Sequence, residues 1–118
     1  MQKYKVGAYL RLSKEEFSNE KESNSITNQR QIINNYLKEH KEYALVDYYI
    51  DDGYSGTNFN RPEFQRMLSD IESGKDSVDY VLVFKLSRFG RNAADVLSSL
   101  QIMQDYGANL ICVEDGID

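Results

Sequence analysis

The stretch Val6-Gly7-Ala8-Tyr9-Leu10-Arg11-Leu12-Ser13 decides the fold, because it is an apolar run near the start of the chain that ends in a cation and a hydroxyl. Side chains alternate between the two faces of a β-strand. If residues 5–12 form a strand, Arg11 and Ser13 lie on the same face and emerge side by side where the strand ends. The arginine fork fits phosphate oxygens, so the serine beside it is a candidate nucleophile toward phosphate. A pair of solvated side chains is the plainer interpretation of such a short pattern.

The composition limits which kinds of protein this chain can be. The chain has 118 residues, of which 41% are hydrophobic and 28% are charged, and this predicts one globular domain with a real core. Its net charge of −5 argues against tight binding of duplex DNA by this segment alone, because DNA affinity rests on neutralising phosphates. No apolar run reaches the length of a membrane span, and the N-terminus is unlike a signal peptide, so we expect a cytoplasmic protein without membrane contact.

Several kinds of site are disfavoured. The single cysteine, Cys112, excludes an intrachain disulfide and a cysteine-rich zinc site. The single histidine, His40, lies in a charged run at a predicted helix end, which leaves no candidate for a Ser-His-Asp triad. Asp51 and Asp52 have no third metal ligand at a recognisable spacing, so we interpret them as turn residues. No phosphate-binding glycine loop follows residues 5–12, and we expect neither a metal nor another cofactor.

The remaining apolar patterns alternate between strand and helix. Ser25 is a candidate N-cap, Pro62 occupies the tolerated first helical position, and Gly74 ends the helix that Pro62 opens. The resulting order βαβαβαβ predicts an α/β three-layer sandwich with a mostly parallel, four- or five-stranded sheet in the order 2-1-3-4. Beyond the first strand, the expected elements are a loop 14–24, a helix 26–40, a strand 43–50, a loop 51–58, a helix 61–74, a strand 78–86, a helix 92–106 and a strand 109–114.

A cluster of basic residues lies at the end of the predicted strand 78–86 and just after it. Lys85, Arg88 and Arg91 place three cations in seven residues of an otherwise acidic chain. Arg88 and Arg91 are three residues apart at the start of a predicted helix, where amide groups favour an anion and where arginines oppose the helix dipole. In a sheet of order 2-1-3-4 the first and third strands are neighbours, and ligands bind beyond the strand ends at such a point. We therefore expect these arginines to meet Arg11 and Ser13 in one crevice.

Four motifs in register then resemble a known family. They are Tyr-x-Arg-x-Ser at 9–13, Ser-x-x-x-Gln at 25–29, Ser55-Gly56 followed by Arg61-Pro62, and Lys-x-x-Arg-x-Gly-Arg at 85–91. Together they resemble the N-terminal catalytic domain of the serine site-specific recombinases, the resolvase/invertase family, over nearly the whole chain. The long insert after Ser13 resembles the large-recombinase branch, which mobile elements often carry.

The resemblance implies a mechanism of DNA recombination. Ser13 would attack a DNA phosphodiester and form a 5′-phosphoserine link, and strand exchange and religation would follow in a synaptic homotetramer built from homodimers. The site residues that the resemblance implies are the catalytic Ser13, Arg11, Arg88 and Arg91, with Arg61, Gln29 and Ser55 in support and no metal. Ser87 departs from the small resolvases, which have aspartate at that position, and this leaves the general acid and base unidentified.

The resemblance also implies that residues 1–118 are a fragment. Family members continue into a long helix and DNA-binding domains, so duplex DNA would be bound through the full-length protein, and the isolated fragment is expected to be inactive. Two alternatives stay open. Ser87 motivates a non-catalytic assembly module with the same fold, and Asp51 with Asp52 motivates a flavodoxin-like or receiver-like ligand-binding domain.

Overall fold

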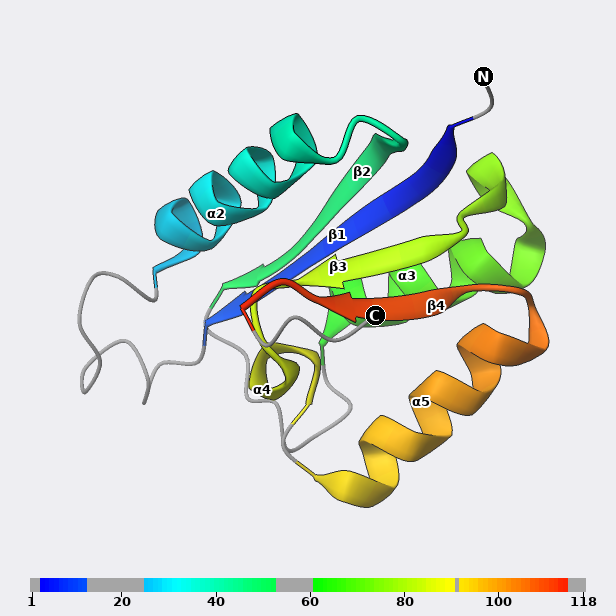
Figure 1. The fold of residues 1–118 in the computed structure, drawn as a ribbon. Helices are drawn as coiled ribbons and strands as arrows, with labels where there is room; N and C mark the ends of the chain where they lie inside the picture. The colour runs from blue at the N-terminus through cyan, green and yellow to red at the C-terminus, as the bar shows by residue number, and fades with distance from the viewer. Residues whose placement is uncertain (1–2, 13–24, 53–60, 91, 115–118) are drawn as a thin grey trace.

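The described part of the chain builds one parallel sheet with helices on both faces (Figure 1). The computed structural model describes residues 3–12, 25–52, 61–90 and 92–114. Their strand order is β2-β1-β3-β4, and every pairing is parallel, which confirms the predicted class and order. The strands are β1 (Tyr4–Leu12), β2 (Tyr43–Asp52), β3 (Tyr80–Val83) and β4 (Asn109–Cys112); the main helices are α2 (Ile26–Glu39), α3 (Pro62–Ser73) and α5 (Ala93–Asp105).

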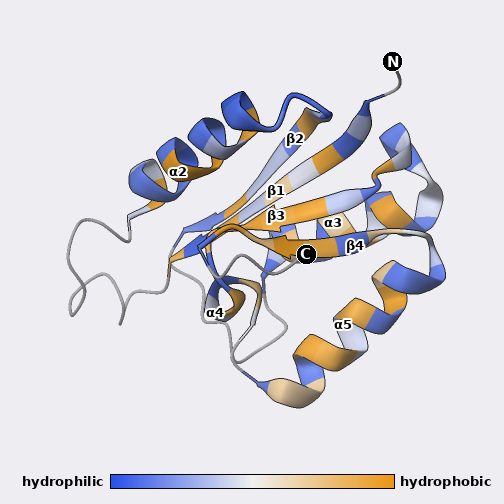
Figure 2. Ribbon diagram, viewed as in Figure 1, coloured by the Kyte–Doolittle hydropathy of each residue, from blue (hydrophilic) through white to orange (hydrophobic). Residues whose placement is uncertain are grey.

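Strand β1 is buried on both faces, and its side chains alternate as predicted. Ala8 and Leu10 pack with Ile33 of α2 on one face. Tyr9 packs on the other face, against Phe64 of α3. Apolar residues therefore concentrate in the sheet and on the inner sides of the helices (Figure 2). The outer side of α2 is polar, whereas α5 also exposes the apolar Leu97.

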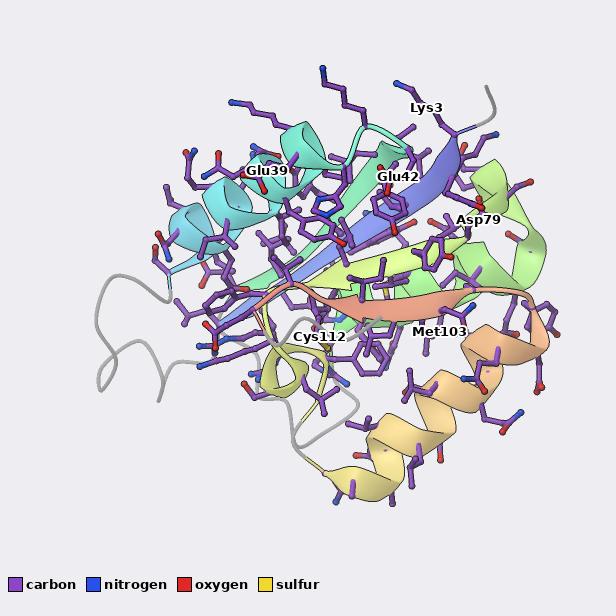
Figure 3. The ribbon with its side chains drawn as sticks, viewed as in Figure 1. Lys3, Glu39, Glu42, Asp79, Met103 and Cys112 are labelled. Carbon is purple, nitrogen blue, oxygen red and sulfur yellow. The ribbon has the colours of Figure 1, made fainter. Side chains whose placement is uncertain are left out.

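The face that α3 and α5 cover depends on a close approach at Gly7. A Cβ at this position would lie 3.1 Å from the ring of Tyr49, so the absence of a side chain lets that ring lie across β1. Met103 of α5 and Cys112 of β4 belong to the same core (Figure 3). Cys112 is thus a buried core residue, as the sequence predicts.

The helix ends follow the expected local chemistry. Ser25 caps α2, with its Oγ accepting a hydrogen bond of 3.1 Å from the amide of Asn28. Pro62 occupies the first turn of α3. Gly74 ends α3 with φ of 77°, a left-handed conformation that glycine adopts without steric cost. A short 3₁₀ turn, η2 (Lys75–Ser77), leads on toward β3.

The predicted boundaries of β3 are wrong. Instead of continuing to residue 86, β3 ends at Val83, and the chain forms a one-turn helix, α4 (Leu86–Phe89). The amide of Arg88 donates to the carbonyl of Lys85 over 2.9 Å, which closes this turn. Periodicity could not reveal α4, because four residues are too few to show a helical period.

The start of α5 also differs from the expectation. Asn92 is its N-cap, and the Asn92 side chain accepts hydrogen bonds from the amides of Ala94 and Asp95. Arg88 lies on the separate turn α4, whereas the sequence predicts that it lies at the start of the helix 92–106. Arg91 itself lies outside the described residues.

Packing on the two faces gives a stability prediction. Replacing Leu82, which is fully buried in the centre of β3, with alanine should destabilise the fold by about 2–5 kcal/mol, because it leaves a cavity in the core. Replacing Leu97, which is 67% exposed on α5, with alanine should change stability by less than about 0.5 kcal/mol. Urea unfolding of the two variants measures the difference, and equal midpoints would contradict the described packing.

Candidate active site

Arg11 joins the end of β1 to the turn α4. Its side chain is fully buried, its Nε donates to the carbonyl of Arg88 over 3.2 Å, and its Nη2 donates to the carbonyl of Ser87 over 2.5 Å. Because β1 and β3 are neighbours in the sheet, the segments that follow them meet at the same edge. The structure therefore brings Arg11, Ser87 and Arg88 together, as the strand order predicts.

Gln29 ties the first turn of α2 to the same point. It is fully buried, and its Nε2 donates to the main-chain carbonyl of Arg11 over 3.0 Å. The end of β1 is thus held from α2 on one side and from α4 on the other. Ser13 lies two residues beyond Arg11 but is outside the described residues, as are Ser55 and the loop 14–24.

Arg61 reaches α4 from the start of α3. It is 1% exposed, and its guanidinium carbon lies 3.9 Å from the centre of the Phe64 ring. Its Nη1 donates to the carbonyl of Phe89 over 2.7 Å. The last carbonyls of a helix accept no hydrogen bond from within that helix, so other groups have to bind them. Arg11 and Arg61 together bind three consecutive carbonyls of α4, those of residues 87, 88 and 89.

Asp51 is a buried residue next to the site whose contacts the sequence did not reveal. We had predicted a turn at 51–58, but Asp51 and Asp52 belong to β2, and Asp51 is buried. Its two carboxylate oxygens accept hydrogen bonds of 3.0 Å from the amides of Glu63 and Phe64. Asp51 therefore caps α3 from another element. Arg61, the residue at the N-cap position, makes no capping bond with its side chain, and this missing signal could have suggested an external cap.

Tyr9 connects Asp51 to Arg61. The Tyr9 hydroxyl donates to Asp51 Oδ2 over 2.9 Å and accepts from Arg61 Nη1 at 3.4 Å. Burial raises the pKa of this hydroxyl above its ordinary value of 10.0, Arg61 offsets part of the rise, and the Asp51 carboxylate adds to it. Tyr9 therefore stays neutral and keeps its proton for Asp51.

Positive charge gathers at this edge of the sheet. Within the described ranges, the buried charged side chains are Arg11, Arg61, Arg88 and Asp51. The opposite edge differs, because Lys3, Glu39, Glu42 and Asp79 lie around it with both signs mixed and none fully buried (Figure 3). Buried cations are costly unless anions or hydrogen-bond acceptors compensate them. The carboxyl edge is thus the part of the described structure best suited to an anion.

Raised phenol pKa values give a pH prediction. Tyr9 and Tyr49 both have pKa values above 10.0, mainly because they are buried. The unfolded chain releases these protons near pH 10 while the folded chain retains them, so stability should fall as pH rises beyond about 10. Tyr9→Phe should reduce this alkaline loss, measured as urea midpoints between about pH 8 and 11. An unchanged pH dependence in Tyr9→Phe would contradict the described environment of the hydroxyl.

The fold and the site together define an α/β domain in which arginines converge at the carboxyl edge of a parallel sheet, beside the strand that leads into a serine. The chain belongs to the resolvase family, because residues 6–118 match the family model of the resolvase N-terminal domain. None of the helices in the described ranges is long and apolar enough to cross a membrane. Those ranges also contain no group of three or more His, Cys, Asp or Glu side chains placed to bind a metal.

Two curated proteins with similar sequences support the same family. The chain is 32% identical over 69 residues to the serine recombinase gin of Escherichia phage Mu, covering 58% of this chain and 34% of that protein. It is 31% identical over 75 residues to the DNA-invertase hin of Salmonella typhimurium, covering 64% and 37% respectively. The chain therefore spans about a third of the length of these curated relatives.

Solved structures extend the likeness over nearly the whole chain. A resolvase family site-specific recombinase from Streptococcus pneumoniae is 53% identical with a TM-score of 0.83, covering 98% of this chain and 76% of that one. The N-terminal catalytic domain of TP901-1 integrase is 29% identical with a TM-score of 0.80, covering 95% and 78%. These comparisons support the fold and the family; the roles of individual site residues stay predictions.

Proposed function

We propose that this chain is the catalytic domain of a serine recombinase, and that Ser13 attacks a phosphodiester of duplex DNA. The observation that carries the proposal is the convergence of Arg11, Arg61 and Arg88 at the end of β1, the strand that leads into Ser13. Phosphoryl transfer depends mainly on positioning and on stabilising negative charge, and guanidinium groups supply both.

The proposed reaction exchanges one phosphodiester for another. Oγ of Ser13 bonds to phosphorus and gives up its proton, while the bond between phosphorus and the 3′-oxygen breaks and that oxygen takes up a proton. The products are a 5′-phosphoserine link and a free 3′-hydroxyl. After strand exchange a 3′-hydroxyl attacks the phosphoserine and restores Ser13. Because the number of phosphodiester bonds is conserved, the cycle needs no ATP.

The site residues take distinct roles in this proposal. Arg11, Arg88 and Arg91 hold the phosphate and stabilise its charge in the transition state, while Gln29 and Ser55 support the site. The hydrogen bond from Gln29 to the Arg11 carbonyl supports such a role, because it fixes the strand end that leads into Ser13. Ser87 occupies the position where the small resolvases have aspartate, so the proton donor to the leaving oxygen is left unassigned.

Assembly belongs to the full-length protein. The chain carries a net charge of −5, so most of the affinity for duplex DNA should come from other, more basic parts of the full-length protein. Two homodimers would pair as a synaptic homotetramer to bring four strands together for exchange.

A labelled-strand assay tests the proposed function. Full-length protein is mixed with a duplex that carries its recombination site, and the products are separated under denaturing conditions. We expect protein to remain attached to the 5′ end at the break and the other fragment to carry an extendable 3′-hydroxyl. Synapsis without any covalent adduct would favour the assembly module instead, and attachment to the 3′ end would overturn the proposed chemistry.

A further inference from the structure

The network around Arg61 assigns this residue a role different from that of the other arginines. Its guanidinium is stacked on Phe64 and held by the Phe89 carbonyl, and Tyr9 and Asp51 link it to the cap of α3. These contacts join β1, β2, α3 and α4 in one buried set of interactions. The shortest hydrogen bond of Arg61, at 2.7 Å, is accepted by the carbonyl of Phe89, the residue next to Arg88.

We propose that Arg61 is a positioning residue: it fixes α4, and with it Ser87 and Arg88, through the Phe89 carbonyl, and it does not itself contact the scissile phosphate. The inference rests on the proposed function, because it concerns how Arg88 is placed for phosphate. Within the described residues, only the amides of Arg88 and Gly90 close this one-turn helix from within, so its orientation depends on its neighbours. Arg11 binds the carbonyls of residues 87 and 88, and Arg61 binds the remaining one.

A direct phosphate contact is the competing interpretation of Arg61. Its Nε is buried and makes no hydrogen bond in the described structure, so that one donor is available. Two observations favour positioning. The guanidinium is stacked on the Phe64 ring, and its Nη1 already binds Phe89 and Tyr9. Moving the guanidinium to a phosphate would remove the support of α4 at the moment when Arg88 has to be in place.

A double-mutant cycle with Arg88 separates the two roles. The full-length protein is tested in single-turnover cleavage of a duplex that carries its recombination site. The slowing caused by Arg61→Met is measured in the wild-type protein and again in a protein that already carries Arg88→Met. We expect roughly 10–100-fold slowing in the wild-type protein and less than about threefold in the Arg88→Met protein, because a residue that acts through Arg88 has no further effect once that side chain is gone. A residue that contacts the phosphate itself should slow cleavage to a similar degree in both proteins.

The outcomes distinguish this inference from the proposed function. If the wild-type protein forms no adduct on this duplex, the proposed function fails. If the wild-type protein cleaves and the slowing of Arg61→Met is as large in the Arg88→Met protein as in the wild type, the positioning role is overturned.

Amide hydrogen exchange is a second readout that needs no cleavage. In Arg61→Met the amides of Arg88 and Gly90, which close α4, should exchange about fivefold faster or more, while the amide of Val96 in α5 should be unchanged. Arg66→Met is the matched control, because Arg66 lies on the same helix but binds Glu63 and Asp47. Unchanged exchange in α4 overturns the proposal.

Tyr9→Phe keeps the test decisive if Arg61→Met does not fold. It retains the buried ring and removes only the hydroxyl that joins Arg61 to Asp51. We expect faster exchange at the amides of Arg88 and Gly90 in this variant too, and slowing that disappears in a protein that already carries Arg88→Met. Slowing of equal size in both proteins, or α4 exchange equal to that of the wild type, counts against the positioning role.

Discussion

Ser13→Ala is expected to abolish the covalent DNA adduct and to reduce cleavage by roughly 10⁴-fold or more. Alanine removes only the oxygen that would bond to phosphorus and keeps the backbone and Cβ. Arg88 and Arg11 would still bind the phosphate, but no nucleophile would be in reach. A denaturing gel with end-labelled duplex measures the adduct, and gel-shift assays show whether the variant still binds the site.

The matched control is Ser98→Ala. Ser98 is an exposed serine of α5, on a helix away from the end of β1, so its loss should leave adduct formation at the wild-type level. Far-ultraviolet circular dichroism checks that both variants fold. An adduct that persists in Ser13→Ala would show that another residue is the nucleophile.

Arg88→Ala is expected to slow cleavage by roughly 10²–10³-fold while changing DNA affinity by less than about threefold. The side chain is 1% exposed, in the turn whose carbonyls Arg11 and Arg61 hold. A charge fixed in such a low-dielectric place stabilises developing negative charge strongly. Affinity depends on many phosphate contacts across the full-length protein, so the loss of this one should affect the chemical step and leave binding nearly unchanged.

Arg66→Ala is the control for a loss of charge as such. Arg66 is half-exposed, and it binds Asp47, Glu63 and Asp70 and the carbonyl of Tyr48, none of which belongs to α4. Its replacement should change the cleavage rate by less than about threefold. Equal slowing in Arg88→Ala and Arg66→Ala would contradict a specific role for Arg88.

The sheet could be predicted because its signals are local and periodic. The alternation in residues 6–12 assigned Tyr9 and Leu10 to opposite faces, and the structure has them in opposite cores. The nearly continuous apolar run around Val81 predicted a central strand buried on both faces, which β3 is. With the strand order, these patterns were enough to place Arg11 next to Ser87 and Arg88.

The network behind the site could not be predicted because its interactions are long-range. Asp51 caps a helix that begins eleven residues later, and no spacing rule connects a strand end to the first turn of the next helix. The turn α4 was hidden because its first residues continue an apolar run, so they resemble strand. The proposed role of Arg61 follows only once the Phe89 carbonyl is seen to be its acceptor.

Mass spectrometry of the covalent adduct tests the central claim most directly. Full-length protein is trapped with its DNA site and digested with nuclease and protease, and the peptide that carries the residual nucleotide is sequenced by fragmentation. We expect the nucleotide to be attached through a 5′-phosphate to Ser13. Attachment to any other residue, or no nucleotide-bearing peptide from DNA that has been cleaved, would contradict it.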